Sequence, residues 1–233
     1  MDFSRFISLK GEFEAEGLAR DTVAAEVVYA ARNKLPYLVK IGGCEAKSDV
    51  RFLRQIGVKS VVAPMIESAF AMRKYQDMLG DDGFDHVGVT IETIDAVERI
   101  DAILDAGIKL TEVTVGRTDL TASYGGSGVD SERTVAMVKT VARAATARGL
   151  PTTMGGAINA GTVALLQRDA ELREVVHAVE TRKCVMMVER FLEPGALADA
   201  FAVEEALLDM QLQTHGAIAD AARNRVGQLR SRL

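Results

Sequence analysis

The sequence has little of what several common function classes need. It contains no tryptophan, only 5% aromatic residues, two cysteines and three histidines among 233 residues. Few aromatics leave few surfaces on which bases could stack. Lys and Arg number 28 against 33 Asp and Glu, a net charge of −5, whereas a nucleic-acid binder needs a basic face. We therefore expect no nucleic-acid partner.

Other motifs are also missing. Cys44 and Cys184 are too few for a disulfide framework or a cysteine-rich zinc site. The sequence holds no nucleotide-binding motif of the GxGxxG or GxxxxGK[ST] type, and no Ser-His-Asp or Cys-His pattern that would indicate an activated nucleophile. Because no apolar run approaches the length of a membrane span and no secretory signal pattern is seen, we expect a cytoplasmic protein with no membrane partner.

What the sequence does contain is a regular alternation of helical and strand patterns. Amphipathic stretches end at Gly57, Gly107 and Gly149, which suit the left-handed position after a helix, and an apolar run follows each. The strand runs are continuous rather than alternating, which is typical of parallel strands buried on both faces. The pattern predicts an α/β fold with seven strands, at residues 7–13, 37–41, 60–66, 86–91, 112–116, 152–157 and 178–186.

The length fits one (β/α) barrel with a helical tail. We predict a TIM-type barrel over residues 1–193 and a C-terminal helical extension over residues 194–233. A closed barrel of this type needs eight strands, so one strand is missing or irregular. Either an irregular strand lies within residues 184–191, or a helix or a neighbouring subunit closes the barrel. The apolar residues Phe201 and Leu208 in the extension pack on the barrel or on another subunit, and we expect a homo-oligomer.

Charged residues follow several of the predicted strands. Lys40, Glu67, Glu92, Arg117 and Asp119 each come at or just after the end of a strand run. In parallel α/β folds the carboxyl ends of the strands form the catalytic face, so these side chains should converge on one rim. The sequence predicts a site there.

The residue types on this rim suggest roles. Glu92 and Asp119 are oxygen ligands suited to Mg²⁺ or Mn²⁺, although each could instead cap the following helix. Lys40 and Arg117 could bind a substrate carboxylate or stabilise an oxyanion, or could pair with Glu67 or Glu92.

Two further patterns lie near the same predicted face. Gly155-Gly156 follows a late strand, where paired glycines allow close approach of a ligand and free N–H groups for an anion, or simply form a tight turn. Lys10, Glu12 and Glu14 fall on one side of the first strand at a period of two. Glu14 is thus a candidate general base, with a solvated sheet edge as the alternative.

Three motifs occur in order, each separated from the next by an α/β unit. Residues 61–68 read VVAPMIES, residues 91–93 read IET, and residues 116–121 read GRTDLT, with Gly125 beyond them. This arrangement resembles the HpcH/HpaI aldolase and citrate lyase β-subunit family, most closely over residues 34–125. The resemblance implies a TIM-type barrel of the phosphoenolpyruvate/pyruvate superfamily. It also implies a divalent metal on Glu92 and Asp119 and a 2-oxo acid substrate such as pyruvate or oxaloacetate.

The resemblance therefore predicts a metal-dependent carbon–carbon lyase or aldolase. Lys40 stands where the family commonly has an arginine, and the region of Glu14 stands where family aldolases use a histidine. We expect Lys40 and Arg117 to neutralise the enolate or carboxylate, with Glu14 as base. Glu67, Gly116, Gly155 and Gly156 are expected to contact the substrate. Two alternatives remain: a phosphate-handling barrel that uses Gly155-Gly156, and a non-catalytic barrel that serves as a binding or assembly subunit.

Overall fold

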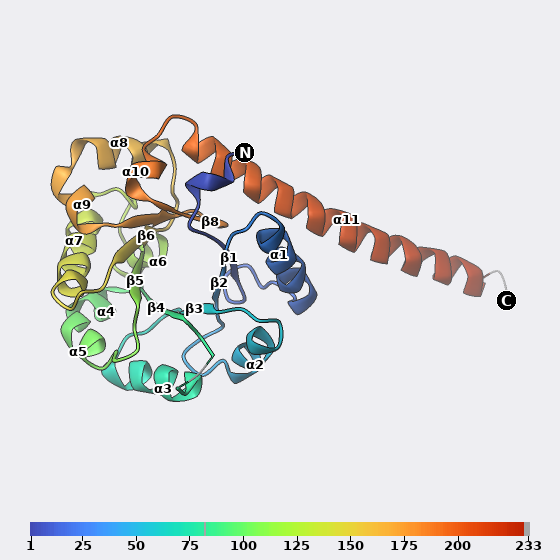
Figure 1. Cartoon of the computed structure of the whole chain (residues 1–233), viewed down its shortest axis with the longest axis horizontal. Coiled ribbons are helices and arrows are strands. Elements are labelled where there is room, and N and C mark those ends of the chain that lie inside the picture. Colours follow the sequence, from blue (N-terminus) through green and yellow to red (C-terminus); the bar gives the residue numbers. More distant parts are fainter. Residues whose placement is uncertain (82, 231–233) are drawn as a thin grey trace.

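The computed structural model describes residues 1–81 and 83–230, which form a closed eight-stranded barrel surrounded by helices (Figure 1). The strands are β1 (Ser8–Glu12), β2 (Tyr37–Lys40), β3 (Ser60–Ala63), β4 (His86–Ile91), β5 (Glu112–Gly116), β6 (Thr152–Gly155), β7 (Ala178–Glu180) and β8 (Cys184–Met187). The helices are η1 (Phe3–Arg5), α1 (Arg20–Arg32), α2 (Lys47–Gln55), α3 (Ala69–Leu79), α4 (Ile94–Glu98), α5 (Ile100–Asp105), α6 (Arg117–Ser123), α7 (Glu132–Thr146), α8 (Ala160–Arg168), α9 (Ala170–Val175), α10 (Val188–Phe191) and α11 (Ala196–Arg230).

Strands β1 to β7 follow one another around the barrel and each is parallel to the next. Their carboxyl ends therefore meet at one mouth, as the sequence predicts. The TIM-type barrel is confirmed, and six of the seven predicted strands are found, several of them shorter than predicted. The predicted strand over residues 178–186 is wrong as a single strand, because the chain turns at Thr181 and returns from Cys184 as β8.

Strand β8 closes the barrel by pairing antiparallel with both β7 and β1. A parallel strand needs a crossover of about ten residues or more, and only three residues separate Glu180 from Cys184. The short turn therefore forces the reversed direction. The irregular eighth strand lies inside the predicted segment 184–191, and Leu9 opposite Cys184 completes the ring within one chain.

The β7–β8 turn has a consequence for the mouth of the barrel. It places Arg182 and Lys183 at the carboxyl ends of the other strands. Lys183 is fully buried there, with its Nζ 2.6 Å from Glu16 Oε2 and 3.0 Å from Glu26 Oε1. Glu26 also accepts a hydrogen bond from the Tyr37 hydroxyl. The turn is thus anchored to α1 and β2 by a buried polar cluster.

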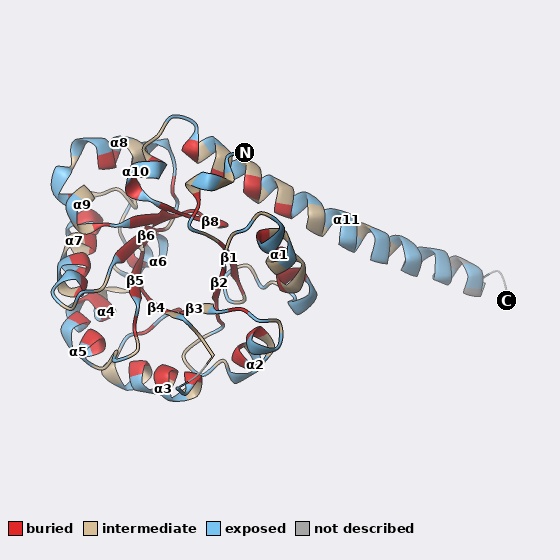
Figure 2. Cartoon of the chain, in the orientation of Figure 1, coloured by how far each residue is buried: buried red, intermediate tan, exposed pale blue. Residues whose placement is uncertain are grey.

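Helix α11 begins against the barrel and then leaves it (Figure 1). Ala196, Ala200, Val203 and Leu207 are buried and share one face at helical spacing, so this stripe packs on the barrel. Most of the described residues in the second half of the helix are exposed (Figure 2). A helix thus occupies the predicted C-terminal extension, and its first turns belong to the barrel wall. Within residues 1–81 and 83–230, no helix is both long and apolar enough to cross a membrane.

The strand surfaces facing the mouth are unusually charged. Barrel interiors of this type are commonly filled by branched apolar side chains. Here five ionisable residues on the strands or directly after them are only 2–8% exposed at this mouth: Lys10, Glu12, Lys40, Glu92 and Glu180. Buried charges persist only when they pair with one another or with a ligand, so these residues mark the functional region.

Candidate functional site

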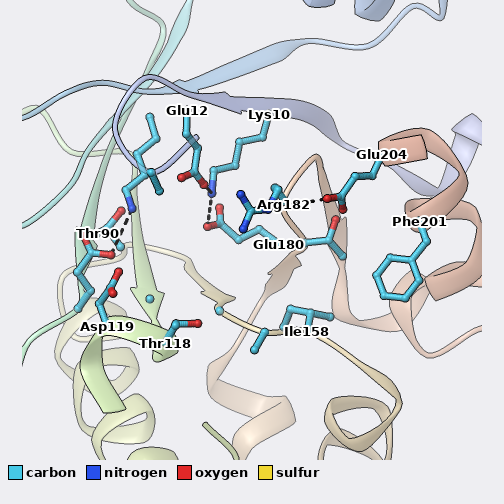
Figure 3. Close-up of a pocket in the computed structure, with 17 residues that line it drawn as sticks. Lys10, Glu12, Thr90, Thr118, Asp119, Ile158, Glu180, Arg182, Phe201 and Glu204 are labelled. Carbon is cyan, nitrogen blue, oxygen red and sulfur yellow. Dashed lines mark hydrogen bonds and ion pairs between the residues drawn. The ribbon is translucent and has the colours of Figure 1, made fainter. Parts of the chain in front are cut away.

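A pocket of about 350 Å³ opens at the carboxyl ends of the strands (Figure 3). Strands β1, β2, β4, β5 and β7, the β7–β8 turn and α11 all contribute to its lining. Five carboxylates and three cations line it: Glu12, Glu92, Asp119, Glu180 and Glu204, and Lys10, Lys40 and Arg182. The lining therefore carries an excess of negative charge when all eight groups are ionised.

Glu92 is held at both carboxylate oxygens. Oε1 accepts the backbone N–H of Met65 at 2.9 Å, and Oε2 lies 3.3 Å from Lys40 Nζ. Met65 has a φ of 52°, a left-handed conformation that is unfavourable for a side chain of its size, and this turn aims its N–H at the pocket. Burial raises the pKa of Glu92 although Lys40 and the Met65 N–H act in the opposite direction.

Asp119 faces the same end of the pocket from the first turn of α6 (Figure 3). Among the described residues no hydrogen bond or ion pair holds its carboxylate, and its charge contributes to the raised pKa of Glu92. Two carboxylates that face each other at one end of a pocket favour a bound cation there.

Lys40 lies between carboxylates from two sides. Its Nζ is 3.2 Å from Glu14 Oε2 and 3.3 Å from Glu92 Oε2. Burial alone would lower the pKa of Lys40, but the charges of Glu92 and Glu12 outweigh it and the net pKa is raised. Lys40 is therefore a permanent ammonium that faces the pocket.

A second cation, Lys10, lies deeper in the lining. Its Nζ is 2.8 Å from Glu12 Oε1 and 2.6 Å from Glu180 Oε1 (Figure 3). Burial raises the pKa of Glu180 despite Lys10, and the charges of Glu112 and Glu12 raise it further. In Glu12 the effect of burial is outweighed by Lys10, and the net pKa is lowered. Of the two partners of Lys10, Glu180 is thus the one that holds a proton more readily.

The predicted substrate glycines make room for carboxylates. A Cβ on Gly116 would lie 2.7 Å from Glu92 Oε2, and a Cβ on Gly155 would lie 2.8 Å from Glu180 Oε1. Gly156 has a φ of 86° and lies against the start of α6, where a Cβ would be 2.6 Å from the Thr118 backbone nitrogen. Gly116 and Gly156 line the pocket, and Gly155 lies behind Glu180.

Arg117 does not face the pocket. Its side chain is fully buried, with Nε donating to the Gly155 carbonyl at 3.0 Å, Nη2 donating to the Gly156 carbonyl at 2.8 Å, and Nη1 paired with Asp130. As the first residue of α6, it points back across the end of β6 rather than into the mouth. The geometry thus directs the Arg117 guanidinium away from the pocket, and the catalytic role that the sequence predicts for it stays a prediction.

Glu67 and Glu14 also lie apart from the pocket lining. Strand β3 ends at Ala63, earlier than predicted, and the turn at Met65 carries Glu67 to an exposed position. Glu14 contacts Lys40, as an ion pair, but is not itself among the lining residues. Lys40, Glu92 and Asp119, in contrast, come together as predicted.

Sequence reasoning assigned no role to several lining residues. Glu180 and Arg182 come from the β7–β8 turn, and Phe201 and Glu204 come from α11. A signal for the first pair exists, since the run Glu180-Thr181-Arg182-Lys183 interrupts an apolar strand pattern. Phe201 and Glu204 carry no local signal, because only the packing of α11 brings them to the mouth.

The lining chemistry fits a divalent cation at Glu92 and Asp119. Mg²⁺ prefers oxygen ligands and is commonly bound by one or two carboxylates, with water and substrate in the other positions. In residues 1–81 and 83–230 no cluster of three His, Cys, Asp or Glu ligands could form a closed protein site. Two carboxylates in an open, negatively charged pocket agree with a Mg²⁺ site that water and substrate complete, and not with a structural zinc site.

Comparison of the whole fold finds several solved structures with a similar fold. The citrate synthase SbnG has a TM-score of 0.64 at 13% identity, over 89% of this chain and 86% of that one. An HpcH/HpaI aldolase from Desulfitobacterium hafniense DCB-2 has a TM-score of 0.57 at 20% identity, over 66% and 70% of the two chains. RipC from Yersinia pestis has a TM-score of 0.53 at 19% identity, over 71% and 76%.

Sequence comparison adds nothing to these structural matches. No protein-family model matches the chain, and no curated protein matches it. At identities of 20% or less, the structural matches establish the fold. The resemblance predicted from the motifs is thus confirmed at the level of the fold, because one of the structures with a similar fold is an HpcH/HpaI aldolase.

Proposed function

We propose that this chain is a divalent-metal-dependent carbon–carbon lyase or aldolase of the HpcH/HpaI aldolase and citrate lyase type, acting on a 2-oxo acid. The observation that carries the proposal is the meeting of Glu92, Asp119 and Lys40 at one end of a pocket in the barrel mouth. Two carboxylates for a cation beside a fixed ammonium form a site suited to an anionic, enolisable substrate. The shared fold with an HpcH/HpaI aldolase supports the same reaction class.

Glu92 and Asp119 would hold Mg²⁺ or Mn²⁺. When bound, the cation acts as a Lewis acid toward the carboxylate and carbonyl oxygens of a 2-oxo acid and favours the enolate. The Met65 N–H fixes the orientation of Glu92, and Gly116 leaves the space that its carboxylate needs. The excess negative charge of the lining attracts a cation and repels an anion, so we expect the cation to bind before the anionic substrate.

Lys40 stabilises the negative charge that develops on the substrate oxygen as the carbon–carbon bond breaks or forms. Its Nζ already neutralises Glu92 and Glu14, and it remains protonated because these groups raise its pKa. A preorganised ammonium in a buried pocket needs little reorganisation as the charge moves. Glu14 acts on Lys40 as a charge partner.

Glu180 is the group we assign to proton transfer. It lines the pocket, is 8% exposed, and has a raised pKa. In the enolising direction its carboxylate accepts a proton from the carbon next to the substrate carbonyl. The electron pair of that C–H bond forms the C=C bond of the enolate, and the π pair of the C=O bond moves to the oxygen. Lys10 lies 2.6 Å from Glu180 and keeps the carboxylate oriented when it is ionised. The same carboxyl returns the proton in the reverse direction.

The pocket gives less support to a phosphate-handling enzyme. Gly155 faces Glu180 at close range, and the space beside Gly156 is filled by the start of α6. Asn159 caps α8 with its own side chain, 2.7 Å from the Gly161 nitrogen. A phosphate at Gly155-Gly156 would therefore meet a carboxylate rather than free N–H groups.

A comparison of oxalate binding with phosphate binding tests the proposal. Oxalate resembles the enolate of pyruvate, whereas inorganic phosphate does not. We expect oxalate to bind in the presence of Mg²⁺ and to lose affinity at least about tenfold when the cation is removed, while phosphate binds weakly in both conditions. Metal-independent binding of phosphate in preference to oxalate would contradict the proposed reaction class. A non-catalytic barrel would bind oxalate but leave the methyl protons of pyruvate unexchanged.

A further inference from the structure

The pocket has two chemically different ends. At one end lie Asp119 and Thr90, and at the other lie Phe201, Glu204 and Ile158, with Glu180 and Arg182 between them (Figure 3). The proposed reaction uses the first end and Glu180, and assigns no role to the second end. The second end is built from the loop after β6 and from α11.

Two apolar side chains, Phe201 and Ile158, line the second end. Ile158 is 8% exposed beneath the pocket, and Phe201 is 42% exposed on α11. A half-exposed phenyl ring that lines a pocket is available for contact with a ligand. Val203 and Leu207, on the neighbouring face of α11, are buried in the barrel wall, so the ring is held on a fixed support.

The charges at this end balance each other. Arg182 Nε lies 3.8 Å from Glu204 Oε1, with their side chains 56% and 25% exposed. An anionic group near Arg182 would also meet Glu204, Glu180 and Glu12, all of which line the same pocket. A neutral group avoids this repulsion and can lie against Phe201 and Ile158.

The volume of the pocket exceeds what a small 2-oxo acid needs. Pyruvate has six heavy atoms and takes the place of only a few waters, each of which occupies about 30 Å³ in the liquid. The pocket of about 350 Å³ leaves room for a second group of the size of a phenyl ring or a short alkyl chain.

We infer that Phe201, Ile158 and the Arg182–Glu204 pair form a second subsite that takes an uncharged, apolar group. The ligand is thus a 2-oxo acid whose far end is apolar, or in the proposed reaction an apolar aldehyde beside the 2-oxo acid. The inference rests on the proposed function for the 2-oxo acid part of the ligand, called the head group below. For the apolar part, called the tail, it rests on the pocket itself. Phe201 is the specificity-determining residue.

Three 2-oxo acids with different tails test the subsite by direct binding. Isothermal titration with pyruvate, 4-phenyl-2-oxobutanoate and 2-oxoglutarate, each with saturating Mg²⁺, compares a methyl, an apolar and an anionic tail on one head group. We expect the phenyl compound to bind about tenfold tighter than pyruvate, and 2-oxoglutarate to bind no tighter than pyruvate. Phe201→Ala should reduce the phenyl-to-pyruvate ratio at least about threefold and leave pyruvate binding unchanged.

The matched control is Phe70→Ala, since Phe70 is an exposed aromatic on α3 outside the pocket. It should leave all three affinities unchanged. The subsite is wrong if 2-oxoglutarate binds best, if the phenyl compound binds no tighter than pyruvate, or if both alanine variants act alike. The proposed function and the subsite can fail separately. Pyruvate binding that does not depend on Mg²⁺, together with methyl protons that do not exchange, would contradict the proposed function. The subsite would still stand if the protein binds the phenyl compound more tightly than pyruvate and this difference depends on Phe201.

Discussion

Lys40 Nζ lies 3.3 Å from Glu92 Oε2, although Lys40 ends β2 and Glu92 directly follows β4, and β3 separates the two strands. The contact thus passes over the end of β3 at the mouth of the barrel. It joins Lys40, which we propose neutralises an enolate, to Glu92, which we propose holds a metal. Because the backbone N–H of Met65 fixes the other oxygen of Glu92, the relative position of these two groups is set before a ligand binds.

Removal of the proposed metal ligands should weaken divalent-cation binding. Asp119→Asn replaces a carboxylate that has no other partner among the described residues, so we expect at least about tenfold weaker Mn²⁺ binding with little change in stability. Titration of Mn²⁺ followed by electron paramagnetic resonance measures this. Glu67→Gln is the matched control, because Glu67 is an exposed carboxylate outside the pocket. Equal affinities of the wild-type protein and Asp119→Asn would remove Asp119 from the site.

Substitution of Lys40 should alter both turnover and the pH dependence of metal binding. In Lys40→Met the enolate loses its ammonium, and we expect a fall in kcat of about 10²–10³-fold. Loss of Lys40 also raises the already raised pKa of Glu92 further. Since a metal binds the ionised carboxylate, Mn²⁺ binding should then require a higher pH. Lys40→Arg keeps the charge and should leave this pH profile near that of the wild-type protein. If the pH dependence of Mn²⁺ binding were unchanged in Lys40→Met, Lys40 would not control the pKa of Glu92.

Arg117 should prove important for stability. Arg117→Lys keeps a positive charge near Asp130 but loses the two bonds to the Gly155 and Gly156 carbonyls, which would be left with poorer partners in a buried place. We expect the free energy of unfolding to fall by about 2–4 kcal/mol, measured by urea denaturation. Arg148→Lys, in an ion-pair cluster on the surface, should cost less than about 1 kcal/mol. Equal losses in the two variants would contradict this expectation.

The pair at the opposite end of the barrel should make stability depend on pH. His86 Nε2 lies 3.0 Å from Glu112 Oε1, and although burial alone would lower the pKa of His86, Glu112 raises it above 6.5. Protonated His86 therefore stabilises the fold fully below about pH 6.5, and this contribution is lost as the pH rises through the higher pKa of the folded protein. The difference in unfolding free energy between the wild-type protein and His86→Gln should shrink as the pH rises above neutrality. A difference that is constant across this range would contradict the assignment.

The barrel and the meeting of Lys40, Glu92 and Asp119 could be predicted because their signals are local. Runs such as residues 60–63 and 86–91 are β-branched and apolar, and they form the parallel strands expected of them. Lys40, Glu92 and Asp119 follow such runs closely, and the shared direction of parallel strands brings them together. The last strand was harder, because the turn between β7 and β8 contains no Gly or Pro to mark it.

The side chains that lie elsewhere than the sequence predicts have a common physical explanation in tertiary geometry. Arg117 follows a strand just as Asp119 does, but the first residue of α6 points to the end of β6 whereas Asp119 points into the mouth. Glu67 leaves the rim because of the left-handed turn at Met65. Phe201 reaches the pocket only because a stripe of small and apolar residues packs α11 on the barrel. The predicted oligomer and the residue roles within the site stay predictions.

Exchange of the methyl protons of pyruvate for deuterium, followed by NMR, tests the central claim most directly. With Mg²⁺ or Mn²⁺ present, the protein should accelerate exchange, a chelator should abolish the acceleration, and added metal should restore it. Asp119→Asn and Glu180→Gln should each lower the exchange rate at least about a hundredfold, while Glu67→Gln should exchange at the rate of the wild-type protein. Exchange that is absent with metal, or that persists unchanged in Asp119→Asn and Glu180→Gln, would contradict the account.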